Sequence, residues 1–166
     1  MQTSGGGTAV VPKGPATAEA DADMSAAAEA CVDRIELTAV PSAVRQARRW
    51  AAGRLAQSDP PPAEDLIETA VLLVSELITN AIRAVGPDPD LERHPGRDQI
   101  SLLITPLPAA VRIEVHDHAC GSLPPPLDGA ADSETGRGLM VIAALSRRWG
   151  WQPGPRGKVV WCELSL

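Results

Sequence analysis

Three polar side chains recur along one face of the strongest helical pattern in this 166-residue chain. Glu76, Asn80 and Arg83 stand at positions i, i+4 and i+7, and at about 100° per residue such positions share one narrow stripe. A carboxylate, an amide and a guanidinium would therefore point the same way. A polar stripe that faces water has the same spacing, so spacing alone leaves a functional and a purely structural interpretation open.

A fourth candidate, Asp117, ends a segment with the alternation of a half-buried strand. Val111, Ile113 and Val115 share one face with Asp117, so the pleat directs its carboxylate toward the core. An isolated charge there is unfavourable unless it meets hydrogen-bond donors, and such a carboxylate could accept from an amino group. The alternative is an aspartate that caps the turn after the strand.

Two glycines, Gly136 and Gly138, precede an apolar helical run. Glycine lets a ligand approach the backbone closely, and the unpaired amides at a helix N-terminus favour phosphate. Flexible turns before helices are also common, so this pair is a weak signal by itself. The P-loop and the six-residue dinucleotide glycine pattern are both missing from the sequence.

Other chemistry has little support in the sequence. His116 and His118 flank Asp117, but no third ligand of suitable spacing follows to complete a metal site. The three cysteines are widely spaced and form no CxxC pair, which indicates neither a disulfide framework nor a zinc site and favours a reducing cytoplasm. No grouping of Ser, His and Asp, or of Cys and His, indicates a hydrolase.

The elements that must position these residues follow from periodicity and from proline and glycine breaks. Helices are expected at 44–55, with Ser42 as a cap, at 63–85 and at 137–147. Strands are expected at 32–37, 99–105, 111–117, 149–151 and 159–164, the last two as a terminal hairpin. This order predicts an α+β fold, a two-layer α/β sandwich with helices on one face of a mostly antiparallel sheet.

Composition limits the domain organisation and the partners. In residues 1–30, 20 positions are Gly, Ala, Pro, Ser or Thr, so we expect a disordered Ala/Gly-rich tail before one folded domain at 31–166. A net charge of -6 and the lack of Phe and Tyr argue against direct nucleic-acid binding. No apolar run reaches the roughly 20 residues that cross a bilayer, and no secretory signal is recognisable.

Taken in order, three segments resemble the GHKL (Bergerat-fold) ATPase superfamily, most closely its anti-sigma-factor serine/threonine kinase branch. Ser75–Ile82 (SELITNAI) is similar to the N-box of that branch, Val115–Gly121 (VHDHACG) to its first glycine box and Glu134–Leu139 (ETGRGL) to its second. Gly157–Trp161 (GKVVW) resembles the last strand of the family. The resemblance covers residues 32–166 and implies a histidine-kinase-like ATP-binding domain.

The resemblance implies a role for each matching residue. Asn80 would ligate Mg²⁺ that bridges the phosphates of ATP, and Glu76 would act as general base toward the attacking hydroxyl. Asp117 would accept from the exocyclic amine of adenine. The remaining cofactor-binding positions would be in the two glycine boxes, near the phosphates and beneath a short lid at 122–135: Gly121, Gly136, Arg137 and Gly138.

One position departs from the pattern of the family. Where the first glycine box has Asp-x-Gly-x-Gly, this chain has Ala119 in place of the first glycine. The resemblance implies a regulator that binds a sigma factor, phosphorylates a small antagonist protein, or does both, and that can form a homodimer; the cysteine usage predicts a cytoplasmic location. The alternatives are a noncatalytic interaction module with a degenerate nucleotide site and a structural domain that binds no nucleotide.

Overall fold

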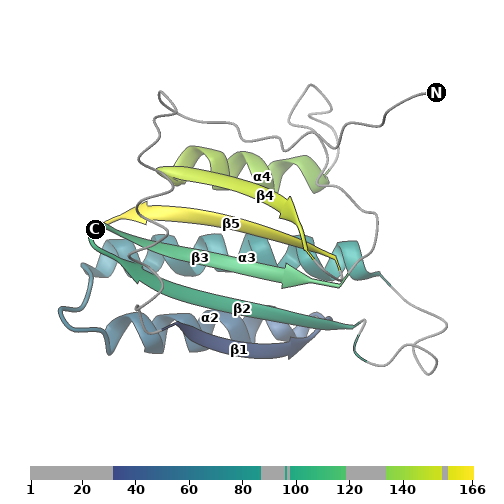
Figure 1. The fold of residues 1–166 in the computed structure, drawn as a ribbon, viewed down its shortest axis with the longest axis horizontal. Coiled ribbons are helices and arrows are strands. Elements are labelled where there is room, and N and C mark those ends of the chain that lie inside the picture. The colour runs from purple at the N-terminus through teal and green to yellow at the C-terminus, as the bar shows by residue number, and fades with distance from the viewer. Residues whose placement is uncertain (1–31, 87–95, 97, 119–133, 155–156) are drawn as a thin grey trace.

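The computed structural model describes residues 32–86, 96, 98–118, 134–154 and 157–166 (Figure 1). The tail expected at 1–30 lies outside these residues, and so does the lid expected at 122–135 except for its last two positions. Gly121 and Ala119 are outside them as well. In the part of the chain that is described, no helix is long and apolar enough to cross a bilayer.

Three helices and five strands make up the described fold (Figure 1). The helices are α2 (Ser42–Ala56), α3 (Glu64–Val85) and α4 (Glu134–Leu145). The strands are β1 (Asp33–Thr38), β2 (Gln99–Leu107), β3 (Ala110–Asp117), β4 (Arg148–Pro153) and β5 (Lys158–Ser165).

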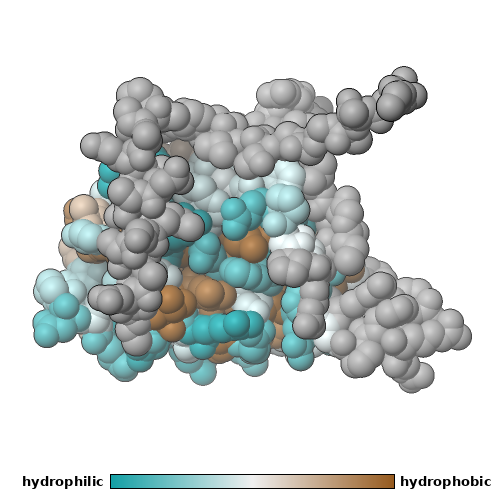
Figure 2. Space-filling view, in the orientation of Figure 1, coloured by the Kyte–Doolittle hydropathy of each residue, from teal (hydrophilic) through white to brown (hydrophobic). Residues whose placement is uncertain are grey.

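The five strands form one sheet in the order β1-β2-β3-β5-β4, and every neighbouring pair is antiparallel. All three helices lie behind this sheet in Figure 1, so they share one face of the sheet, and none of the described helices is on the other face. The predicted α+β two-layer sandwich is confirmed. Figure 2 views the helix-free face, where hydrophilic residues are interspersed with apolar ones.

The structure corrects the expected ends of two helices. Ser42 is the first residue of α2 and not its cap, because Pro41 takes the cap position without a side-chain hydrogen bond. The helix expected at 137–147 begins three residues earlier, at Glu134, and ends at Leu145. Gly136 and Gly138 therefore lie inside the first turns of α4 and not before it.

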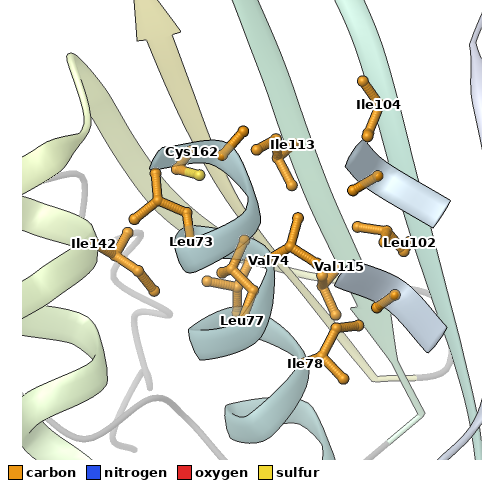
Figure 3. Close-up of a cluster of buried hydrophobic side chains, with 14 of the residues drawn as sticks. Leu73, Val74, Leu77, Ile78, Leu102, Ile104, Ile113, Val115, Ile142 and Cys162 are labelled. Carbon is orange, nitrogen blue, oxygen red and sulfur yellow. The ribbon is translucent and has the colours of Figure 1, made fainter. Parts of the chain in front are cut away.

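The core lies between the helices and the sheet. Leu73, Leu77 and Ile78 of α3 are fully buried against inward residues of the central strands, such as Ile113 and Val115 (Figure 3). The 3.6-residue period of α3 and the two-residue alternation of β3 place these side chains on facing surfaces. This packing fixes the rotation of α3 about its axis. It therefore also fixes the direction of the polar stripe that contains Glu76 and Asn80.

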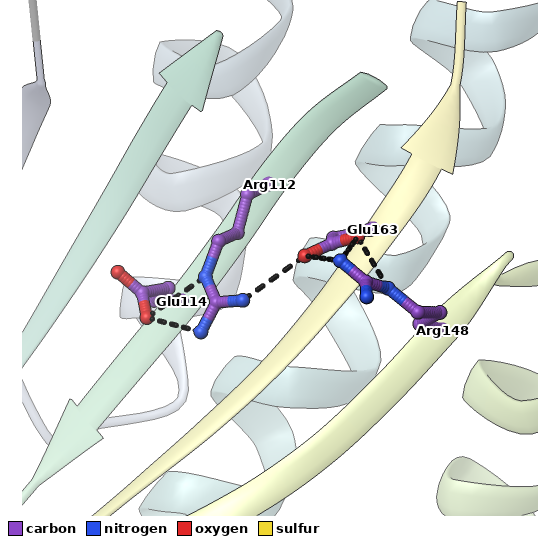
Figure 4. Close-up of polar contacts among 4 residues, drawn as sticks. All are labelled: Arg112, Glu114, Arg148 and Glu163. Atoms are coloured by element: carbon purple, nitrogen blue, oxygen red, sulfur yellow. Dashed lines mark hydrogen bonds and ion pairs between the residues drawn. The ribbon is translucent and has the colours of Figure 1, made fainter. Parts of the chain in front are cut away.

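The helix-free face also carries a network of charged side chains. Arg112 of β3 donates to Glu114 and to Glu163 of β5, and Arg148 of β4 donates to the same Glu163 (Figure 4). The side chain of Glu163 is only 2% exposed, so the two guanidinium groups supply the hydrogen bonds that a buried carboxylate needs. The Arg112 guanidinium also lies 4.1 Å from the ring centroid of Trp161.

Candidate functional site

Glu76 and Asn80 converge on one glycine of α4. A Cβ placed on Gly138 would lie 2.7 Å from Oε2 of Glu76 and 3.3 Å from both polar atoms of the Asn80 amide. Real Cβ atoms essentially never approach as closely as the first of these distances. The absence of a side chain at Gly138 therefore lets α4 pack against the polar stripe of α3, and that stripe faces a neighbouring helix as well as solvent.

The amide of Asn80 has unused hydrogen-bonding capacity. Asn80 is half-buried, and its Nδ2 is a buried donor with no hydrogen-bond partner among the residues that the structure describes. An orphaned buried donor is unfavourable unless a ligand satisfies it. The amide offers an oxygen of the kind that Mg²⁺ prefers and a donor for a phosphate oxygen, so this donor set fits the expected Mg-ATP.

Asp117 forms a buried ion pair that crosses from β3 to β5. The strand register places it opposite Lys158, and Nζ of Lys158 lies 2.8 Å from Oδ2 of Asp117. The side chains are 8% and 1% exposed for Lys158 and Asp117. This burial agrees with the inward direction that the strand alternation predicted for the Asp117 carboxylate. The carboxylate is paired with the ammonium group of Lys158. A carboxylate has about four acceptor positions, so it can accept from an adenine amine in addition.

Gly157 and Lys158 are site residues for which the sequence alone predicted no role. A Cβ on Gly157 would overlap the carbonyl oxygen of Asp117, so only glycine lets the start of β5 lie this close to the end of β3. Lys158 alternates with Val160, Cys162 and Leu164, which are all buried. A lysine on the inward face of a strand requires a counter-ion, and that was the available signal.

The two groups of residues flank the same region of the core. Ile78, between Glu76 and Asn80 on α3, and Val115, two residues before Asp117, belong to one buried cluster (Figure 3). In Figure 1 the last turns of α3, the start of α4 and the end of β3 lie at the same end of the sheet, so the group around Gly138 and the ion pair of Asp117 are at that end. This arrangement could hold a polar ligand between α3, α4 and the ends of the central strands.

The other expected site residues are placed as follows. Gly136 and Arg137 are in the first turn of α4, where backbone N–H groups have no acceptor within the helix, and Arg137 is exposed. Arg83 is exposed in the last turn of α3. Gly121 lies outside the described residues, so its expected role stays a prediction.

The two histidines that flank Asp117 have different surroundings. Nδ1 of His118 lies 2.8 Å from the carbonyl oxygen of Gly96, whereas His116 is on the helix-free side of β3. Burial lowers the pKa of His116 below its ordinary value, against the opposing influence of Glu114. Among the described residues, no group of three or more His, Cys, Asp or Glu side chains could hold a metal ion.

Comparison with known families agrees with this geometry. Residues 37–164 match the family model described as the histidine kinase-like ATPase domain. A comparison with curated proteins gave no match. The matched region contains every described residue of the site, from Glu76 on α3 to Lys158 on β5, and it spans most of the chain. The chain therefore belongs to the histidine kinase-like ATPase domain family, and this membership implies ATP binding.

Proposed function

We propose that the protein is an ATP-binding regulator that phosphorylates serine or threonine on a small antagonist protein, binds a sigma factor, or does both. The observation that carries the proposal is the convergence of Glu76 and Asn80 on Gly138. A general base and a metal ligand are needed on the same side of a bound nucleotide for phosphoryl transfer. Two turns of α3 supply both side chains.

Each residue has a distinct part in the proposed reaction. Asp117 would orient adenine by accepting from its exocyclic amine, while its Oδ2 stays paired with Nζ of Lys158. The oxygen of Asn80 would hold Mg²⁺, which neutralises charge on the phosphates during transfer. Oε2 of Glu76 would take the proton of the attacking serine or threonine hydroxyl. The hydroxyl oxygen then bonds to the γ-phosphorus while the bond to ADP breaks and ADP leaves.

The first test asks whether nucleotide binds at this site. We expect Mg-ATP to raise the melting temperature, because a ligand at 100 times its Kd adds about 2.7 kcal/mol to the free energy of unfolding. Asp117→Asn should remove most of that increase, and Glu68→Gln, an exposed change on α3, should leave it intact. A melting curve that Mg-ATP does not shift, together with no heat in calorimetry at millimolar nucleotide, would refute nucleotide binding.

The second test concerns phosphoryl transfer. Radiolabelled γ-phosphate should move from ATP to a candidate antagonist protein, and Glu76→Gln should lower the rate by about 100-fold or more while Mg-ATP still shifts the melting curve. Glu68→Gln is again the matched control. If no candidate partner is labelled although ATP binds, the proposal of a kinase activity is wrong.

A noncatalytic interaction module is the second candidate, and two observations favour it. The Asp117 carboxylate already holds a buried ammonium group, so adenine must share it, and Ala119 replaces the first glycine of the family pattern. In this alternative, nucleotide would only stabilise the fold or adjust the affinity for a partner. Unchanged partner regulation by the Glu76→Gln variant would favour the module over the kinase.

Homodimer formation, implied by the family resemblance, stays a separate proposal that sedimentation measurements can test.

A further inference from the structure

A cavity lies at the opposite end of the sheet from the candidate nucleotide site. It has a volume of about 700 Å³, is partly open to solvent and is lined by the α2–α3 connection, the β2–β3 turn and the last residues of β5. In Figure 1 this is the end marked C. Val111 lines the cavity and Asp117 stands six residues further along β3, so the two sites are separated by about 20 Å at 3.3 Å per strand residue.

The floor and walls of the cavity are apolar and stiff. Leu55, Ile104 and Val111 are buried core residues that also line it, so its floor continues the hydrophobic core. Five of the lining residues are prolines, including the run 60–62. Proline rings have a restricted φ and no N–H donor, so these walls neither collapse easily nor leave backbone donors unsatisfied. Such a volume and lining are typical of small-molecule sites.

The charges around the cavity are predominantly acidic. Its lining contains three carboxylates, Asp33, Asp59 and Asp65, and one basic side chain, Arg54. Nη2 of Arg54 donates to Oδ1 of Asp33 at 2.5 Å, so this pair is internally neutral. Asp59 and Asp65 are exposed, and within the described part of the chain neither is paired with a basic side chain. A positive charge on a ligand would be favoured at this rim.

From these observations we propose that this cavity binds a small organic cation, in which an apolar body fills the space between the prolines and an amine lies near Asp59 and Asp65. The proposal does not depend on nucleotide binding, because no residue of the candidate nucleotide site lines the cavity. The apolar body would contribute most of the affinity, and the amine would provide the selectivity.

The test uses three fluorescent compounds with one apolar body and different ends. Dansylcadaverine carries an amine, N-butyl dansyl sulfonamide is neutral and dansyl-aminocaproate carries a carboxylate. With the full chain, we expect saturable binding of dansylcadaverine that is at least threefold tighter than that of the neutral compound and about tenfold tighter than that of the anion. Saturating Mg-ATP should not displace it.

Matched double variants test the role of the rim. The double variant Asp59→Asn/Asp65→Asn should bind dansylcadaverine only as tightly as the neutral compound. The control, Glu64→Gln/Glu68→Gln, removes two acids from the same region that do not line the cavity. This control should leave the affinity for dansylcadaverine unchanged. Methyl NMR signals of Leu66, Leu107 and Val111 should shift on binding. Absence of saturable binding, equal affinity for the three compounds, or shifts confined to Val115 and Ile142 would each overturn the proposal.

Discussion

The carboxylate of Asp117 and the ammonium of Lys158 face each other across β3 and β5 in an ion pair that is almost wholly buried. The strands that carry the two residues are far apart in the sequence, and the antiparallel register brings the residues opposite each other. The close approach of Gly157 to the Asp117 carbonyl keeps the strand ends together. The pair is thus both a support of the fold and a part of the candidate nucleotide site.

Breaking this pair on one side should destabilise the protein strongly. Lys158→Met leaves a buried carboxylate without its ammonium partner, so the free energy of unfolding should fall by about 3–5 kcal/mol. Urea unfolding of Lys158→Met, Asp117→Asn and the double variant measures the coupling. The double variant should lose less than the sum of the single losses, by about 1–3 kcal/mol, and simple additivity would contradict the structure.

Gly138→Ala should lower the affinity for Mg-ATP without lowering the stability of the protein. Its new methyl group would meet the flexible end of Glu76 at 2.7 Å, which can move away, and alanine favours a helix over glycine by up to about 1 kcal/mol. We expect a melting temperature close to that of the wild type and an affinity for Mg-ATP that is about tenfold lower, because Glu76 and Asn80 are displaced.

Gly53→Ala is the matched control for that variant. Gly53 is inside α2, and apart from its chain neighbours and the backbone of its own helix no described atom lies within 4 Å of its added Cβ. This change should raise the free energy of unfolding by about 0.5–1 kcal/mol and leave Mg-ATP affinity unchanged. Equal nucleotide affinities of the two alanine variants would show that Gly138 has no special role.

Substitution of a third glycine, Gly150, should lower the free energy of unfolding, whereas Gly53→Ala raises it. Gly150 of β4 stands opposite Trp161, and an added Cβ would lie 2.9 Å from the indole ring, which also contacts the Arg112 guanidinium. Gly150→Ala should therefore destabilise the protein by about 1–3 kcal/mol through overcrowding. Chemical denaturation followed by circular dichroism measures this change, and a variant as stable as wild type would show that the ring has room to move.

Titration of the buried Cys162 thiol should lower stability only in alkaline solution. Burial raises the pKa of its thiol from 9.0 to about 12, against the weaker opposing influence of a hydrogen bond with Ser146. The unfolded chain therefore releases this proton first, and stability should fall between about pH 9 and 12, by up to about 1.4 kcal/mol per pH unit. The slope should be smaller in Cys162→Ala, and iodoacetamide at pH 8 should modify this cysteine only after denaturant is added.

The sequence by itself determined the elements and the direction of their faces. The apolar period of residues 63–85 predicted a long helix with Glu76 and Asn80 on one stripe, and the alternation in 111–117 predicted an inward Asp117. Both features depend on geometry within one element, 3.6 residues per helical turn and two per strand repeat, so local residues suffice to predict them. The ordered motifs also indicated the family that the comparison showed.

Only the tertiary structure decided which residues meet. The partner of Asp117 depends on the register between β3 and β5, and the contact of Gly138 with Glu76 depends on how α4 packs on α3. The acidic cavity is formed by the α2–α3 connection, the β2–β3 turn and the end of β5. Contacts of this kind join segments that are distant in sequence, and their geometry depends on the packing of the whole core, which no local period encodes.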